Sequence, residues 1–384
     1  MNFEQSSEHK MLADSLDRFL SENYSFETRM SIVQRGDGFS LDIWTKLVEI
    51  GALAALFPEE AGGFGGRGFD IATVFESLGR KLVVEPIMGT MMVGRAIEAV
   101  KNEAHRSLLA SLMEGDLIAA LAHDESGEPV APQQVTVSAE HSADGWLIQG
   151  RKAVVPYAAV ANVLLVSAMT LDGVALILVP SNSPGLSTLP YSVIDGGCAA
   201  DVIFDRVVVP RDALLAGPGL ADSLLEQIQG LGLVALCAEA LGAMDVAIRD
   251  TIQYLQTRRQ FGTELSNFQA LQHRVADLVI EIEQVRSAVI NAAASLDQLR
   301  IPRERALSSA KFTVGRVGAR VAEECIQLHG GIGMSWELPL AHYAKRLVMI
   351  DHQHGDQDFH LARFMALNGA ESACLSRCSR RGRE

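Results

Sequence analysis

Two short segments of the sequence combine an arginine, glutamines and a pair of glycines. The guanidinium of Arg258 is planar and permanently charged, so it can donate a bidentate pair of hydrogen bonds to a phosphate. Gly330 and Gly331 have no Cβ atoms, and their backbone therefore allows a phosphate or a ribose to approach closely. Phe261 adds an apolar wall, and side-chain amides that suit adenosine occur at Gln260, Gln269 and Gln327. Together these residue types are compatible with a nucleotide site.

Local structure offers a simpler explanation for each of the same residues. Arg258 and Arg259 also suit the solvated end of a helix, and Gly330 and Gly331 also suit a helix C-cap. The choice depends on which elements position the two segments.

Helical periodicity dominates both ends of the chain. Apolar residues recur every three to four positions in residues 11–20, 41–53, 71–84 and 88–100. Longer patterns of the same kind cover residues 224–255, 269–299 and 304–328, and a further helix begins at about residue 358. Helices this long and rich in Ala, Leu and Val need several partners. We therefore expect a C-terminal four-helix bundle whose remaining apolar surface forms subunit contacts.

The middle of the chain has a different pattern. Short runs rich in β-branched residues are separated by prolines, and in residues 201–210 Val202 and Phe204 alternate with Ile203 and Asp205, as a half-buried strand requires. We expect an α+β protein with a β-barrel or β-sandwich between two helical parts. The predicted domains are residues 1–116, 117–215 and 216–384.

Composition excludes several classes of protein. The chain has 384 residues, of which 48% are apolar and 21% charged, so it can bury a large core. Its formal net charge of −14 gives no positive field for a nucleic-acid backbone, and we predict no nucleic-acid partner.

The cysteines and the apolar runs bear on the cellular compartment. The five cysteines form no CxxC pair, so free thiols in a reducing compartment are expected. Residues 1–10 lack the apolar region of a secretory signal. Asp172, Glu239 or Asp245 interrupts each of the longest apolar runs, so none is expected to reach the length of a membrane span. We predict a cytoplasmic protein with no membrane partner.

The order of the predicted elements, helices followed by strands and then a helical bundle, resembles that of the acyl-CoA dehydrogenase family. Three sequence segments resemble motifs of the same family. Residues 254–262 (YLQTRRQFG) and the following residues 268–277 are similar to its flavin-binding segment. Residues 327–333 (QLHGGIG) and the loop at 58–66 (PEEAGGFGG) resemble two further family motifs. The resemblance covers the whole chain.

The resemblance implies a fold, a cofactor and a reaction. The family has an α-domain, a β-domain and a four-helix bundle, and it uses FAD to desaturate acyl-CoA thioesters between Cα and Cβ. Electrons are expected to pass to an electron-transfer flavoprotein. By resemblance, FAD contacts are expected at Arg258, Gln260, Phe261, Phe268, Gln269, Gln327, Gly330 and Gly331.

The sequence departs from the family at the catalytic base. Most members place a Glu before Gly-Thr after the paired glycines, and the matching position here is His354. A second family solution places the Glu where this chain has Gly232, followed by Leu233. Glu239 lies in the same helix but matches neither position. The His and Asp residues of 351–358 also suggest a metal site, but we interpret them as a solvated loop before a helix and predict no metal.

The β-domain motifs depart as well. The family pattern TEPxAGSD, which holds the isoalloxazine, corresponds to residues 122–127 (AHDESG). In the pattern GxKxWIT, Val154 replaces the Trp that covers the flavin ring and Pro156 replaces the Thr. These substitutions remove hydrogen-bond donors and an aromatic wall.

The chain keeps the motifs for the nucleotide end of FAD and lacks those for the flavin ring and the base. This pattern predicts an enzyme built from two different chains. In the family one subunit holds the isoalloxazine and the base, and its neighbour holds the pyrophosphate and adenine. This chain resembles the small subunit of pimeloyl-CoA-type dehydrogenases, so we expect an α2β2 heterotetramer with a second dehydrogenase chain that acts on a linear, dicarboxylic or steroid side-chain thioester. Two alternatives remain: a self-sufficient homo-oligomer in which His354 or Asp356 is the base, and a non-catalytic scaffold.

Overall fold

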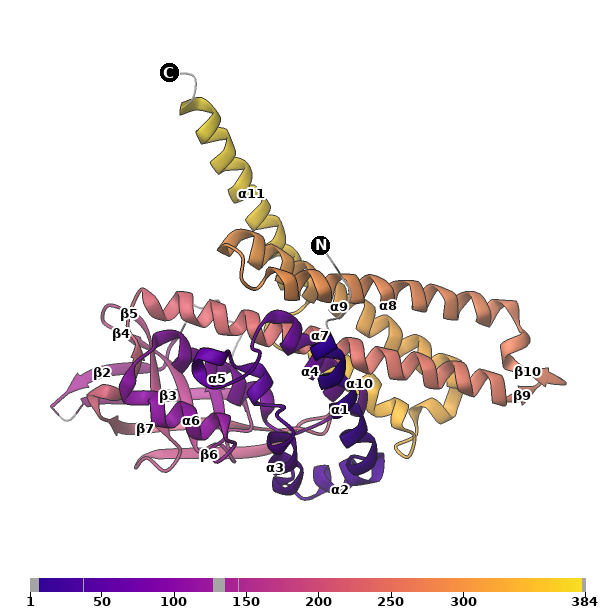
Figure 1. Ribbon diagram of the computed structural model, residues 1–384, viewed down its shortest axis with the longest axis horizontal. Coiled ribbons are helices and arrows are strands. Elements are labelled where there is room, and N and C mark those ends of the chain that lie inside the picture. The colour runs from indigo at the N-terminus through magenta and orange to yellow at the C-terminus, as the bar shows by residue number, and fades with distance from the viewer. Residues whose placement is uncertain (1–6, 37, 127–134, 144, 382–384) are drawn as a thin grey trace. The chain divides into compact units, whose positions relative to one another are not determined.

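A computed structural model describes residues 7–36, 38–126, 135–143 and 145–381, with side chains as far as Gly369. Gly127 of the β-domain motif, and the side chains of Cys374 and Cys378, lie outside these residues. Figure 1 shows the course of the chain and the labels of its elements.

The chain divides into two compact units. The helical unit contains Met1–Glu22, Arg67–Leu82 and Leu233–Glu384, and the sheet unit contains Asn23–Gly66 and Val83–Gly232. The three predicted domains, residues 1–116, 117–215 and 216–384, stay a prediction.

The sheet unit begins with short helices that polar caps define. Ser25 and Ser40 accept hydrogen bonds from backbone N–H groups of the first turns of α2 and α3, which satisfies donors that a helix start leaves unpaired. The helices of this unit are α2 (Phe26–Gln34), α3 (Leu41–Glu49), η1 (Ala54–Leu56), η2 (Glu59–Ala61), α5 (Ile87–Val100), η3 (Glu103–His105), α6 (Arg106–Met113) and η5 (Arg211–Ala213).

One eight-stranded sheet is the main element of this unit, in the order β6-β7-β3-β2-β4-β5-β8 with β1 parallel to β4. The strands are β1 (Ala119–Ala122), β2 (Ser138–Ser142), β3 (Gly145–Pro156), β4 (Val163–Thr170), β5 (Gly173–Pro180), β6 (Leu186–Ser192), β7 (Cys198–Val209) and β8 (Leu214–Ala216). In β7, Val202 and Phe204 are buried while Asp205 is exposed, which confirms the predicted alternation.

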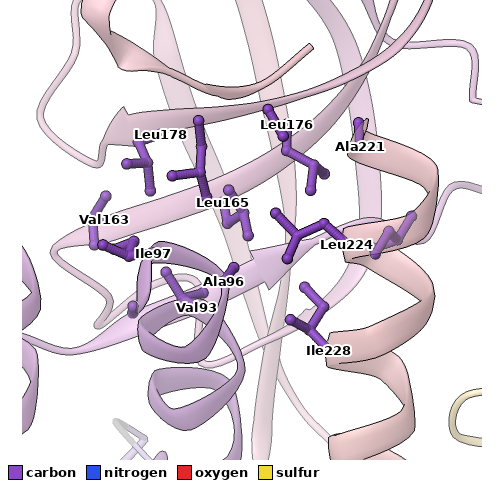
Figure 2. Close-up of a cluster of buried hydrophobic side chains, with 14 of the residues drawn as sticks. Val93, Ala96, Ile97, Val163, Leu165, Leu176, Leu178, Ala221, Leu224 and Ile228 are labelled. Atoms are coloured by element: carbon purple, nitrogen blue, oxygen red, sulfur yellow. The ribbon is translucent and has the colours of Figure 1, made fainter. Parts of the chain in front are cut away.

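A hydrophobic core joins the sheet to two helices. Leu165 of β4 and Leu176 of β5 pack with Val93 of α5, and Leu224 and Ile228 of helix α7 (Leu220–Thr257) complete the cluster (Figure 2). Such fully buried side chains each stabilise a fold by about 1.5–3 kcal/mol.

The helical unit is organised around one long central helix. Helix α9 (Arg300–His329) packs against α8 (Gln269–Ser295), α10 (Pro339–His352) and α11 (Gln357–Arg381). The other elements are α1 (Ser7–Asn23), α4 (Gly68–Lys81), β9 (Arg259–Gln260), β10 (Thr263–Glu264), η6 (Leu265–Asn267), η7 (Gly330–Met334) and the part of α7 from Leu233 onwards.

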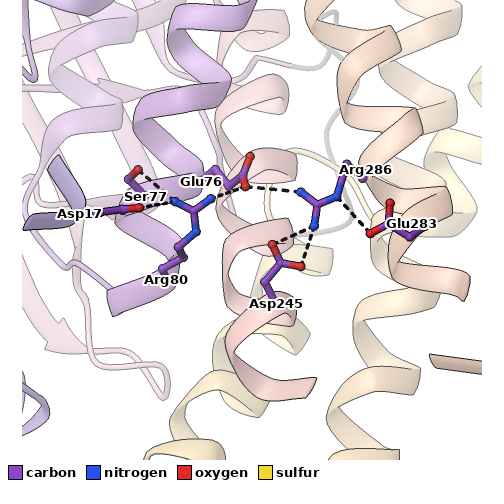
Figure 3. A network of polar contacts seen from close by, with 7 residues as sticks. All are labelled: Asp17, Glu76, Ser77, Arg80, Asp245, Glu283 and Arg286. Atoms are coloured by element: carbon purple, nitrogen blue, oxygen red, sulfur yellow. Dashed lines mark hydrogen bonds and ion pairs between the residues drawn. The ribbon is translucent and has the colours of Figure 1, made fainter. Parts of the chain in front are cut away.

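Helices α4 and α7 cross closely within the helical unit because glycines face backbone on both sides. A Cβ at Gly79 would collide with the carbonyl of Glu239, and a Cβ at Gly242 would collide with the carbonyl of Glu76. Beside this crossing an ion-pair network connects α1, α4, α7 and α8, in which Arg286 binds both carboxylate oxygens of Asp245 at 2.8 and 2.9 Å (Figure 3).

Helix α7 corrects one expectation from the sequence. It contains an 18-residue window with a mean hydropathy of 1.9, so by length and composition it does reach a membrane span. In the structure 89% of that window is buried, as in the core helix of a folded domain. The predicted fold, helices followed by a sheet and then a helical bundle, is confirmed.

Candidate functional site

The first predicted segment forms a tight hairpin directly after α7. Strands β9 and β10 pair across a two-residue turn, Phe261-Gly262, in which both residues have positive φ, 55° and 81°. Such a turn favours Asn-Gly, and a bulky side chain at its first position is strained. Phe261 is nevertheless 89% exposed, and its ring meets that of Phe268 edge-on at 6.2 Å. The exposed Phe261 ring is therefore available for contact with a ligand.

The paired glycines follow the end of α9. Gly330 has φ 70° and ψ −149°, a conformation that is accessible essentially only to glycine. Gly331 has no positive φ, and a Cβ added at either position would meet nothing within 4 Å among the described atoms. The described chain therefore gives no packing reason for a glycine at 331. Open space above a bare backbone fits the close approach of a phosphate or ribose.

An aromatic stack brings the two segments together. The rings of Tyr254 and His329 lie 4.4 Å apart at an interplanar angle of 20°. Arg258 follows Tyr254 by one helical turn, and Gly330 follows His329 directly. His329 is buried, which lowers its pKa, and its Nδ1 bonds to the Cys325 carbonyl at 2.9 Å. The neutral imidazole is therefore fixed in one orientation.

The other predicted residues lie on the same elements. Gln260 is in β9, Phe268 and Gln269 begin α8, and Gln327 is in the last turn of α9. The three glutamines and Arg258 are exposed. Together with Phe261, Phe268, Gly330 and Gly331 they form what we call the nucleotide half-site. Its charge, amides and open backbone fit the pyrophosphate and adenosine of FAD.

The β-domain face around Val154 differs from the nucleotide half-site because its polar groups are hydrogen-bonded within the chain. Val154 lies at a bulge of β3 with φ 53°, an outlier for a β-branched residue, and its side chain is 53% exposed. Its backbone N–H donates to Asp201 at 3.1 Å, and Tyr191 and Arg151 donate to the same carboxylate. These bonds hold the pKa of Asp201 below its usual range. The polar groups of this face are thus bonded to one another.

Lys152, two residues before Val154 in β3, belongs to a buried polar cluster. The ammonium of Lys152, fully buried, donates to the His123 carbonyl at 2.9 Å, to Glu125 at 2.7 Å and to Ser167 at 3.0 Å. Burial lowers the pKa of Lys152, while for Glu125 the opposing effect of burial is outweighed by the hydrogen bonds from Lys152 and Thr136, which lower its pKa. The residues that match the family's flavin-ring motif therefore serve the packing of this chain.

His354 lies in the turn between α10 and α11, with φ 54° and a half-buried side chain. Its carbonyl accepts from His360 Nε2 at 2.9 Å, and Lys311 Nζ donates to the carbonyls of Asp351 and Gly355 at 2.8 and 2.6 Å. Burial lowers the pKa of His360 to about 4 and also lowers that of Lys311. This turn is rigidly supported from α9 and α11.

The acidic alternatives are already paired. Glu239 makes a bidentate ion pair with Arg346 at 2.5 and 2.7 Å, and Asp356 caps α11 by accepting from Phe359 N–H at 2.8 Å. Gly232 and Leu233 are interior residues of α7. Within the described part of the chain, no three His, Cys, Asp or Glu side chains are grouped to hold a metal ion.

Several residues of these sites were not predicted. Tyr254 and His329 stand inside the quoted motifs, but no spacing rule shows that two residues so far apart in sequence stack. Lys311 and His360 act on backbone carbonyls, for which a sequence has no signature. Their only signal is a charged or polar residue within an apolar helical pattern.

Comparisons with known proteins agree with the fold and with these motifs. Models of the acyl-CoA dehydrogenase N-terminal domain and C-terminal domain match residues 6–116 and 231–364. The probable acyl-CoA dehydrogenase YngJ of Bacillus subtilis (strain 168) is 27% identical over 347 residues, which are 87% of this chain and 90% of that protein.

Two solved structures are similar over nearly the whole chain. A variant of the Tcur3481-Tcur3483 steroid ACAD has a TM-score of 0.87 and 29% identity, covering 95% of this chain and 99% of that chain. The ChsE4-ChsE5 complex from Mycobacterium tuberculosis has a TM-score of 0.88 and 24% identity, covering 97% and 99%. The chain belongs to the acyl-CoA dehydrogenase family, FAD-dependent oxidoreductases that act on CH–CH groups.

Proposed function

We propose that this chain is one subunit of a heteromeric acyl-CoA dehydrogenase and completes the FAD site of a partner subunit. The partner holds the isoalloxazine and supplies the carboxylate base. This chain supplies the nucleotide half-site at the ends of α7 and α9.

The observation that carries the proposal is the open backbone at Gly331. Neither φ nor packing among the described residues requires a glycine there, and the strained, exposed Phe261 lies on the same half-site. By contrast, the carboxylate of Asp201 and the ammonium of Lys152 are bonded within the chain. The residues suited to a ligand are retained at the nucleotide half-site. At the face around Val154, the side chains that would face a flavin ring are replaced.

Some of these residues bind FAD through charge and others through shape. The guanidinium of Arg258 pairs with the pyrophosphate, Gly330 and Gly331 let it approach the backbone, and Phe261 covers the adenine. When bound, FAD supplies the acceptor for the hydride that leaves Cβ of the acyl-CoA. The α-proton goes to the base on the partner.

The relatives support a proposal for the assembly and the substrate. The Tcur3481-Tcur3483 steroid ACAD is 29% identical to this chain. Its name combines two designations with the word steroid. We extend both features to this chain: an α2β2 heterotetramer acting on a steroid side-chain or dicarboxylic acyl-CoA, with an electron-transfer flavoprotein as acceptor. We keep a cytoplasmic location as part of the proposal, since Cys237 and Cys325 are buried thiols among the described residues.

Expression alone and in combination tests the proposal. The chain purified alone is expected to lack a flavin absorption spectrum. Co-expressed with an acyl-CoA dehydrogenase chain encoded beside it, it is expected to yield a yellow complex that turns over acyl-CoA with an artificial electron acceptor. A complex without flavin would leave only a scaffold role and would contradict the proposal.

One observation favours a second candidate, in which His354 is the base of a self-sufficient enzyme. The turn that carries His354 is held by Lys311 and His360, as a positioned catalytic group requires. The variant His354→Gln separates the two candidates. Our proposal expects its turnover to stay within about twofold of the parent, whereas the loss expected on removing a general base is about 10²–10⁴-fold.

A further inference from the structure

His329 occupies a central place in the nucleotide half-site. One face of its ring stacks on Tyr254 at 4.4 Å, and its Nδ1 is held by the Cys325 carbonyl at 2.9 Å. On the backbone side, a Cβ at Gly333 would lie 2.9 Å from the His329 Cβ, so the η7 loop that begins with Gly330 packs directly on this residue. The position of His329 therefore fixes the position of the paired glycines.

Tyr254 is connected to Arg258 through backbone hydrogen bonds. Its carbonyl accepts the Arg258 N–H at 2.8 Å, the last hydrogen bond of α7, and the Thr257 hydroxyl at 3.1 Å. The Arg258 carbonyl in turn accepts Leu265 N–H at 2.9 Å, which ties the hairpin to the same point. These backbone bonds connect Tyr254, the end of α7 and the start of the hairpin that carries Arg258 into one hydrogen-bonded segment.

We propose that Tyr254 and His329 are positioning residues whose stack sets the distance between Arg258 and the backbone of Gly330 and Gly331. This inference rests on the proposed function, because it concerns affinity for the pyrophosphate–adenosine end of FAD. Neither ring needs to touch FAD. The stack pre-organises two binding groups that come from helices far apart in the sequence, and pre-organisation raises affinity without a new contact.

The expected effect is moderate because an aromatic pair contributes a moderate energy. Loss of the stack is expected to weaken FAD binding about tenfold. Tyr254→Phe keeps the ring and loses only the hydroxyl, so it is expected to bind FAD within about twofold of the parent. Tyr254→Leu keeps the apolar bulk and loses the ring.

The experiment measures FAD binding by fluorescence titration of the flavin-depleted assembly of this chain, whether its neighbour is a partner dehydrogenase or a second copy. The melting temperature of each flavin-free assembly is measured in parallel. Phe364→Leu is the matched control, because it removes a half-buried ring that contacts Arg305 in the same unit, on α11. Arg258→Ala is the reference for direct contact.

The inference predicts that Tyr254→Leu weakens FAD binding about tenfold while Phe364→Leu does not, with flavin-free melting temperatures within about 3 °C of the parent. Unchanged affinity in Tyr254→Leu would overturn it. So would a lowered melting temperature with no rescue of affinity by Tyr254→Phe, because that result marks a purely structural residue. If Tyr254→Leu does not fold, His329→Gln removes the stack from the other side and is expected to give the same loss.

Arg258→Ala distinguishes failure of the positioning role from failure of the proposed function. If it loses FAD and Tyr254→Leu does not, only the positioning role fails. If Arg258→Ala binds FAD as the parent does, or if no assembly of this chain holds FAD, the proposed function fails and the positioning role fails with it.

Discussion

The nucleotide half-site and the Val154 face differ in what their residues do for the chain itself. At the half-site, Phe261 is strained and exposed, and nothing among the described atoms fills the space above Gly331. Around Val154, Asp201 and Lys152 have hydrogen-bond partners within the chain. A glycine whose open backbone has no packing reason within the chain points to a ligand, whereas groups that are hydrogen-bonded within the chain have a structural role there.

The largest expected effect tests whether the Val154 side is purely structural. Lys152→Met removes a buried ammonium and leaves the carboxylate of Glu125 partly unpaired, so the free energy of unfolding is expected to fall by about 3 kcal/mol. The exposed pair Lys46–Asp42, at 2.9 Å, provides the control, and Lys46→Met is expected to change stability by less than about 0.5 kcal/mol. Urea denaturation measures both. Equal effects would show that the buried cluster adds nothing.

A second prediction uses the pH dependence of stability to test the effect of a buried carboxyl group in the sheet unit. Glu85 is buried, its Oε2 has no hydrogen-bond partner among the described atoms, and burial raises its pKa to about 7. The unfolded carboxyl ionises near 4.5 and the folded one only near 7, so rising pH through this window lowers stability. Glu85→Gln is therefore expected to gain up to about 3 kcal/mol at pH 8.

The same variant should match the parent at pH 4, where both states of the parent are protonated. Thermal melts at the two pH values make the comparison. A gain of equal size at both would show that packing rather than ionisation is responsible.

Gly331→Ala tests the half-site with the smallest possible change. A methyl group there meets nothing within 4 Å in the described part of the chain, so stability is expected to stay within about 0.5 kcal/mol while FAD affinity falls about tenfold. Gly333→Ala is the contrasting variant, because its Cβ would press on His329 and on the Ile326 carbonyl at 2.9 Å and lower stability. Unchanged flavin binding in Gly331→Ala would remove the main support for a ligand at this backbone.

The smallest expected effect returns to Val154. Glycine adopts φ 53° without a steric penalty, so Val154→Gly is expected to raise the free energy of unfolding by about 1 kcal/mol and to leave flavin content unchanged. Val155→Gly, at a buried neighbour with ordinary φ, is expected to be destabilising. If Val154→Gly instead reduced flavin content, this face would hold the cofactor after all.

Periodicity and apolar composition predicted the regular elements. The helices α8 and α9 and the alternation in β7 follow from periodicity, whereas α7, which is 89% buried over an 18-residue window, is marked by its long apolar run. Strand β6 was missed because it is mostly exposed and contains Pro190, so no apolar alternation marks it. Helix α10 was missed although Pro339 marks its first turn.

The candidate site was predictable only as far as chemistry follows from residue type. Arg258 and Gly331 stand out because a guanidinium suits phosphate and because glycine leaves open backbone. The stack of Tyr254 on His329, the support of the His354 turn by Lys311, and the positive φ of Val154 depend on pairings between distant segments. No local spacing contains that information.

The flavin content of the assembled protein tests the central claim most directly. Absorbance of released FAD, divided by the molar amount of all chains in the purified complex, gives the number of flavins per chain. Shared half-sites predict one FAD for every two chains, and none in this chain when it is purified alone. One FAD for every chain, or a yellow protein made of this chain only, would contradict the account.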